Sequence, residues 1–139
     1  MQPHHCRGVV MSAPLRSVSR LASFRHALRG IGRLLQTQAN ARIHLAASSA
    51  VVGLGLLLPL TRTDWALLVL AMGGVWVAEA FNTALETLVD LVSPEWHALA
   101  RDAKDIAAGA VLLATFAAVA LGLLVLAPAL AAQLASLTG

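Results

Sequence analysis

The stretch EAFNTALETLVD, from Glu79 to Asp90, decides the fold of this chain, because it continues directly from an uncharged apolar run, Trp65 to Ala78. At about 100° of rotation per residue of an α-helix, its polar side chains fall within roughly 80° of one another. These residues, which we call the polar stripe, are Glu79, Asn82, Glu86 and Asp90. The pattern predicts one long helix that carries a polar stripe out of a membrane-spanning segment.

Glu79 is the deepest acid of this stripe. If Trp65 lies at the far membrane interface, a rise of ~1.5 Å per residue places Glu79 about 21 Å into a hydrocarbon core that is ~30 Å thick, and Glu86 near its margin. A carboxylate at that depth is costly and indicates a functional site. The alternative interpretation is that the helix extends into water and that its acids form a solvated face. This interpretation fits Asp90 better than Glu79.

The composition is that of a small integral membrane protein. Of 139 residues, 58% are hydrophobic and only 12% are charged, and the mean hydropathy is +0.76. The sequence predicts an all-α membrane fold with spans over residues 43–60, 65–91 and 104–126, the last ending near Pro128. The connection between the first two spans is short enough for a tight hairpin, with Asp64 as a plausible N-cap.

Basic residues are concentrated before the first span, where the arginines are Arg7, Arg16, Arg20, Arg25, Arg29, Arg33 and Arg42. By the positive-inside rule this places the N-terminus in the cytoplasm, and three spans then leave the C-terminus outside. The charged connection from Ser93 to Asp105 would face the cytoplasm as well. These arginines explain the isoelectric point of about 10.5, so nucleic-acid binding is not indicated.

Residues 1–19 are predicted to be a flexible tail, and residues 20–139 a single membrane domain. The tail has no hydrophobic region long enough for a cleaved signal peptide, and Met11 is an alternative start. His4, His5 and Cys6 lack the two further ligands of a metal site.

An amphipathic helix is predicted over residues 20–37. Its basic residues spread over one face and its apolar residues repeat at helical spacing on the other, namely Leu21, Phe24, Leu28, Ile31 and Leu35. Such a helix lies on the membrane surface. Its arginines would meet anionic headgroups, as a simple anchor, or the phosphates of a nucleotide, and the pattern favours neither interpretation.

The spacing of the polar stripe allows two chemical roles. Asn82 and Glu86 are neighbours on the helix, and Glu79 lies about two turns from Glu86 on nearly the same line. A deep carboxylate has its charged form disfavoured, which suits a general base, whereas one at the aqueous edge can hold a hard cation such as Mg²⁺. Glu79 is therefore a candidate base and Glu86 a candidate metal ligand.

A second polar cluster, formed by Arg101, Asp102, Lys104 and Asp105, directly precedes the third span. Lys104 is a candidate partner for nucleotide phosphates. The alternative is a set of ordinary charges flanking a span, with Arg101 and Asp105 as a favourable i,i+4 pair. No P-loop or kinase-type glycine loop is present, so side chains would have to hold any nucleotide. Three thin helices cannot enclose such a site, and we expect chains to assemble so that neighbours complete it.

Together these residues resemble the bacterial integral-membrane lipid kinases, the family of diacylglycerol kinase and the undecaprenol kinases. The similarity extends from Phe24 to about Leu126. Its most specific elements are EAFNTALETLVD and HALARDAKDIAAGAV, the latter from His97 to Val111. The stretches FRHALRGI at Phe24 to Ile31 and NARIH at Asn40 to His44 look more like the undecaprenol kinase branch.

The resemblance implies a Mg²⁺-dependent transfer of the γ-phosphoryl group of ATP to a lipid hydroxyl, by a homotrimeric helix bundle in the bacterial inner membrane. It implies that Glu79 is the general base and contacts the lipid, that Glu86 binds metal and nucleotide, and that Asn82 and Asp90 support them. The residues that it places around ATP are His26, Glu86, Glu95, Trp96, His97, Lys104 and Asp105.

One position departs from the family pattern. The second metal-binding glutamate of the family, on the connector before the first span, corresponds here to Gln38. Glutamine keeps a carbonyl oxygen for Mg²⁺ but removes a negative charge, so metal affinity should be lower.

Two other functions fit parts of the pattern. In a small oligomeric transporter or channel subunit, Glu79 would be an intramembrane proton or cation site, but the outer halves of the spans carry few polar residues. A relative that binds nucleotide without catalysis would explain Gln38. The lipid alcohol itself is not identified, since surfaces that bind acyl or prenyl chains leave no motif.

Overall fold

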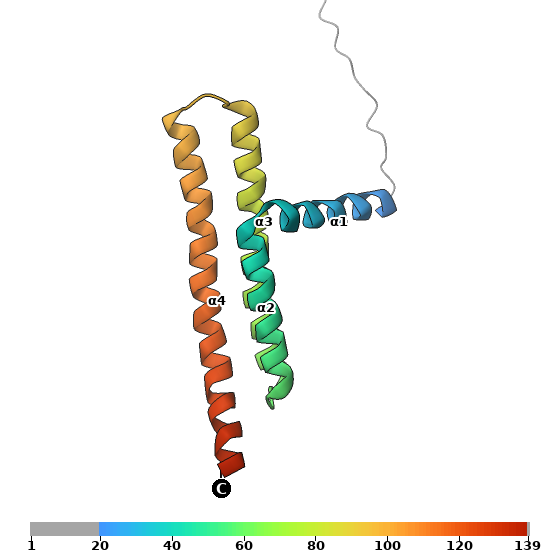
Figure 1. The fold of residues 1–139 in the computed structure, drawn as a ribbon, viewed down its shortest axis with the longest axis vertical. Helices are drawn as coiled ribbons and strands as arrows, with labels where there is room; N and C mark the ends of the chain where they lie inside the picture. The colour runs from blue at the N-terminus through green and yellow to red at the C-terminus, as the bar shows by residue number, and fades with distance from the viewer. Residues whose placement is uncertain (1–19, 139) are drawn as a thin grey trace, which may run out of the picture.

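The computed structural model describes residues 20–138, and these form four α-helices: α1 (Arg20–Thr37), α2 (Ala39–Leu57), α3 (Arg62–Val92) and α4 (Ala98–Thr138). The predicted all-helical fold is thereby confirmed. Three of the helices, α2, α3 and α4, are long and apolar enough to cross a membrane. They run along one another, while α1 extends across them to one side (Figure 1). The predicted tail, with His4, His5 and Cys6, lies outside the described residues.

Helix α3 is the central element, since it contacts each of the other three helices and pairs with α4 most extensively. At ~1.5 Å per residue, its 31 residues span about 46 Å and the 41 residues of α4 about 61 Å, both longer than a hydrocarbon core of ~30 Å. Each helix therefore has room to extend beyond the bilayer, and the polar stripe occupies the C-terminal part of α3.

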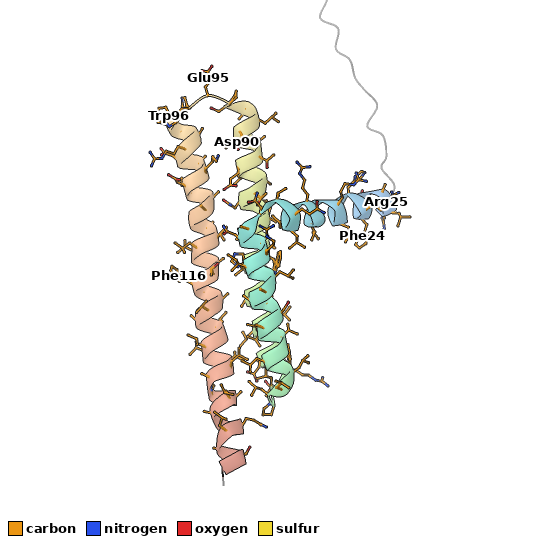
Figure 2. All side chains as sticks on the ribbon, in the orientation of Figure 1. Phe24, Arg25, Asp90, Glu95, Trp96 and Phe116 are labelled. Carbon is orange, nitrogen blue, oxygen red and sulfur yellow. The ribbon has the colours of Figure 1, made fainter. Side chains whose placement is uncertain are left out.

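Few large side chains are buried within the chain; the apolar ones with the least exposure are Leu34, Leu58, Leu68, Val75, Val111 and Val125. Many others face outward from the three long helices, and Phe116 projects from the side of α4 that faces away from α3 (Figure 2). This arrangement suits a chain whose outer surface meets lipid or another subunit rather than water.

Helix α1 forms over the predicted residues, and it carries a row of exposed apolar side chains: Leu21, Phe24, Leu28 and Ile31. Leu34, near its C-terminus, is buried where α1 meets the bundle. The placement of α1 on a membrane surface stays a prediction.

Gln38 alone separates α1 from α2. Its backbone is extended (φ −103°, ψ 121°), and its N–H donates to the carbonyl oxygen of Leu34 at 2.9 Å. The Gln38 side chain makes no capping hydrogen bond to α2. A single extended residue is thus sufficient to turn the chain from the crosswise helix into the bundle.

The turn between α2 and α3 ends in a capping box, and the expectation that Asp64 is the N-cap was wrong. Thr61 occupies that position: its Oγ1 accepts from the Asp64 backbone N–H at 3.2 Å, and Asp64 Oδ2 accepts from the Thr61 N–H at 2.8 Å. Asp64 is the third residue of the helix instead, a place where an acid can reach back to the cap. Helix α3 therefore begins earlier than expected.

Helix α4 does not end near Pro128 but continues through it to Thr138. Proline removes one backbone donor, and this ordinarily ends or kinks a helix. Membrane-spanning helices tolerate it, because neighbouring helices, Ser/Thr side chains and local adjustments of the backbone satisfy the freed carbonyl group. The long uncharged sequence on both sides of Pro128 therefore outweighs the single missing bond.

Candidate active site

The first three residues of the polar stripe share one cavity of about 280 Å³, at the level where α2 begins. Helix α2 contributes one wall, α3 the polar stripe, and α4 an apolar wall. We call this the stripe cavity; its lining residues are Asn40, Ile43, His44, Glu79, Asn82, Glu86, Ala108, Val111, Leu112 and Thr115. The helical spacing of the stripe therefore does bring Glu79, Asn82 and Glu86 to one place, as predicted.

Glu79 is the most buried polar residue of the described chain, with 1% of its surface exposed, and Asn82 is 7% exposed. Asn82 Nδ2 donates to Glu86 Oε1 at 3.2 Å, as their spacing predicts. By contrast, Glu79 Oε2 and Asn82 Oδ1 are buried without a hydrogen-bond partner. A buried acceptor without a donor is costly, so both oxygens are suited to receive a ligand.

Asn40 and His44, one turn apart on α2, face the stripe from the opposite wall. Neither was predicted as a site residue, although both lie in the NARIH stretch. His44 thus lines the same cavity as Glu79 and Glu86. Which side of α2 meets α3 depends on the packing of the helices, and the α2 sequence alone does not encode it.

A larger hollow of about 410 Å³, which we call the apolar groove, adjoins the stripe cavity between α2, α3 and α4. His44 and Thr115 line both hollows, so they mark the junction between them. Away from this junction the lining is apolar except for Ser48, with Leu54, Leu68, Val75, Leu123, Leu126 and Leu130 among its members. The groove can therefore hold a hydrocarbon chain whose polar end reaches the stripe cavity.

A third hollow of about 380 Å³ lies around the turn between α3 and α4, and we call it the loop hollow. It gathers five of the seven predicted nucleotide residues, Glu95, Trp96, His97, Lys104 and Asp105, together with Asp90 of the polar stripe. Asp90, Glu95 and Trp96 surround this end of the bundle in Figure 2, where Trp96 is 79% exposed. Glu86 and Asp90 are four residues apart on α3, so the stripe cavity and the loop hollow lie only about 6 Å apart along its axis.

Two ion pairs shape the loop hollow. Lys104 Nζ on α4 lies 2.9 Å from Asp90 Oδ1 on α3, a contact between helices that the sequence did not reveal. Arg101 and Asp105 form the predicted i,i+4 pair at 3.5 Å, and both are well exposed. The lysine is thus held by an acid at the edge of the polar stripe, with its amino group directed at the hollow.

His26 and Gln38 are not brought into either polar hollow. His26 is exposed on α1, and Gln38 lies at the α1–α2 junction. Among the described residues, no group of three or more histidine, cysteine, aspartate or glutamate side chains is placed to hold a metal ion. Of the two predicted metal ligands, Glu86 and Gln38, only Glu86 lines one of these hollows.

Residues 25–126 match the family described as prokaryotic diacylglycerol kinase. The chain is 42% identical over 108 residues to an undecaprenol kinase of Bacillus subtilis, covering 78% of this chain and 88% of that protein. It is 47% identical over 111 residues to a diacylglycerol kinase of Synechocystis, covering 79% of this chain but only 63% of that longer protein. These matches confirm the resemblance drawn from the motifs, and the two relatives differ in the lipid that their names give.

Proposed function

Because the chain belongs to the prokaryotic diacylglycerol kinase family and is a lipid kinase, we propose that it transfers the γ-phosphoryl group of ATP to the hydroxyl of undecaprenol or diacylglycerol. The observation that carries this proposal is the environment of Glu79. Glu79 has a buried oxygen without a partner among the described residues, and it lines the stripe cavity, which adjoins the apolar groove. A lipid alcohol needs both surfaces, one for its chain and one for its hydroxyl.

In the proposed reaction, the lipid chain occupies the apolar groove and its hydroxyl lies at the junction beside Glu79. Glu79 takes the hydroxyl proton as the lipid oxygen forms a bond to the γ-phosphorus, and the bond from that phosphorus to the ADP oxygen breaks. Phosphoryl transfer asks chiefly for positioning and charge stabilisation. Asn82 supports this arrangement because its hydrogen bond holds Glu86 in place along the same stripe.

ATP is proposed to occupy the loop hollow, with its phosphates directed along α3 toward Glu86. Lys104 would leave Asp90 for a phosphate oxygen, an exchange that costs little because the pair is partly exposed to water. Glu95, Trp96 and His97 line the outer side of this hollow, where the nucleoside would lie. The exposed indole of Trp96 offers a flat surface for a base.

Magnesium fits this arrangement as an ion held partly by the nucleotide. Glu86 offers a carboxylate and Asn82 a buried amide oxygen without a partner, and oxygen atoms are the ligands that Mg²⁺ prefers. In phosphoryl-transfer sites Mg²⁺ is usually bound through one or two carboxylates together with substrate phosphates. When bound, the ion would neutralise developing charge on the phosphates.

The site would be completed by assembly into a homotrimer in the bacterial inner membrane, with the N-terminus and the polar hollows on the cytoplasmic side. His26 and Gln38 lie outside the hollows of their own chain, so a neighbouring subunit is the proposed route by which they reach ATP and metal. The outward-facing apolar residues of the long helices supply surface for such contacts.

We expect the purified protein to have the mass of three chains in mild detergent, by light scattering with the detergent contribution subtracted. Separation into monomers should abolish activity, because each site would lose residues that a neighbour supplies. A monomer that retains full activity would contradict shared sites.

Gln38→Glu should lower the Mg²⁺ concentration for half-maximal activity by on the order of fivefold, since one added charge at ~4 Å contributes about 1 kcal/mol even in water. The preference between diacylglycerol and undecaprenol should not change. A matched control is Gln36→Glu, which adds the same charge two residues earlier on α1. Superimposable Mg²⁺ titrations for wild type and Gln38→Glu would mean that residue 38 does not ligate the metal.

The proposed function itself is tested by offering diacylglycerol and undecaprenol in parallel to the purified protein with ATP labelled at the γ-phosphate, and separating the lipids by thin-layer chromatography. Label in either lipid supports the proposal, and the faster acceptor identifies the substrate. Binding of ATP without transfer to either lipid would favour the non-catalytic relative. Cation flux in proteoliposomes without transfer would favour a channel subunit.

A further inference from the structure

Each proposed turnover leaves a proton on Glu79, and the enzyme must remove it before the next cycle. Glu79 is 1% exposed, and its Oε2 has no hydrogen-bond partner among residues 20–138. Water therefore has little direct access to the carboxyl group. A second side chain in contact with the stripe cavity is needed to return the proton to the solvent.

The stripe cavity offers few candidates for this step. Helix α4 contributes Ala108, Val111, Leu112 and Thr115, none of which titrates, and α3 contributes Glu86 as its only other ionisable group. Glu86 already accepts a hydrogen bond from Asn82, and it is the proposed metal ligand. Both roles already engage its carboxylate oxygens. The only ionisable residue that lines the apolar groove is His44, which lies at its junction with the stripe cavity.

His44 meets the remaining requirements. It lies on α2, across the stripe cavity from Glu79. It is partly exposed, and Asn40, one turn earlier on α2, is exposed at the beginning of the helix. Histidine is the side chain that exchanges protons most readily between pH 5 and pH 8. A route from the buried carboxyl group to water therefore runs along this face of α2.

We propose that His44 carries the proton from Glu79 to water after each phosphoryl transfer, an inference that rests on the proposed function. The O–H bond of the Glu79 carboxylic acid breaks, and a ring nitrogen of neutral His44 takes the proton with its lone pair. The carboxylate is restored for the next acceptor. The imidazolium then gives its proton to water near Asn40, so the step needs no other reactant.

The test compares wild type with His44→Gln, which keeps hydrogen-bonding capacity and similar size but cannot carry a proton. We expect kcat to fall by about tenfold or more, with the KM values for ATP and lipid nearly unchanged.

A second variant, His44→Ala, leaves space beside the cavity, so added imidazole should restore part of its kcat, whereas His44→Gln should not respond. Leu45→Ala is the matched control, because Leu45 is the next residue on α2 and faces outward; its kcat should be normal.

A normal kcat in His44→Gln would overturn the inference, as would a raised lipid KM with unchanged kcat, which would make His44 a binding residue only. If wild type phosphorylates no lipid alcohol, the proposed function fails and this inference fails with it.

Discussion

Glu79→Gln should lower kcat by on the order of 10²-fold or more and leave the affinity for ATP nearly intact. The substitution keeps the size of the side chain and removes only its ability to take a proton in the transition state. Because Glu79 is buried and one of its oxygens has no partner, the neutral amide should also be tolerated structurally. The measurement is steady-state kinetics in detergent, with ATP varied at saturating lipid.

The matched control for this prediction is Thr87→Ala on the same helix. Thr87 is exposed, and its hydroxyl donates only to the Thr83 carbonyl of its own helix, so its loss should leave kcat unchanged. An unchanged kcat in Glu79→Gln would remove Glu79 from the mechanism. A loss of ATP binding together with kcat would mean that Glu79 contributes to the nucleotide site instead.

Lys104→Ala should raise the KM for ATP by on the order of tenfold or more, since a hydrogen bond to a charged group contributes about 1.5–3 kcal/mol and 1.4 kcal/mol corresponds to a tenfold change. The KM for the lipid should stay close to normal, because Lys104 lines the loop hollow and not the apolar groove. Varying ATP and lipid separately in the transfer assay measures both constants.

Asp102→Asn is the matched control for Lys104→Ala. Asp102 is exposed, lies two residues before Lys104 on α4 and does not line the loop hollow. The KM of the Asp102→Asn variant for ATP should therefore be unchanged. A normal KM for ATP in Lys104→Ala would mean that Lys104 does not bind ATP and is only a charged residue that flanks a membrane span. The pair with Asp90 would then be its only role.

The helices could be predicted from the sequence because their signals are local. Periodic apolar residues define α1 over Arg20–Thr37, and long uncharged stretches define the three helices that can cross a membrane. The ends were less predictable. At Thr61 the cap depends on reciprocal hydrogen bonds between two nearby polar residues, Thr61 and Asp64. At Pro128 the helix continues although proline ordinarily ends or kinks one.

The site could be predicted as far as it lies on one helix. The 3.6-residue period places Glu79, Asn82 and Glu86 together, and the bond between Asn82 and Glu86 follows from their spacing. Contacts between helices could not be predicted in this way, which is why His44 and the pairing of Lys104 with Asp90 became visible only in the folded chain.

Helix α3 is continuous from its cap at Thr61 to Val92. The distance along the helix from its N-terminal end to Glu79 is therefore fixed. At ~1.5 Å per residue, Glu79 stands about 27 Å from Thr61 along the helix, whereas the height of the lipid hydroxyl is set by the surrounding bilayer. The position of Glu79 along α3 is fixed, whereas the depth of the lipid hydroxyl changes with bilayer thickness. The distance between the two groups therefore depends on that thickness. Host lipids with shorter or longer chains would displace the lipid hydroxyl from Glu79, the proposed base, or make α3 tilt at a cost of a fraction of a kcal/mol per Å. The rate of this enzyme should therefore report the thickness of the membrane in which it works.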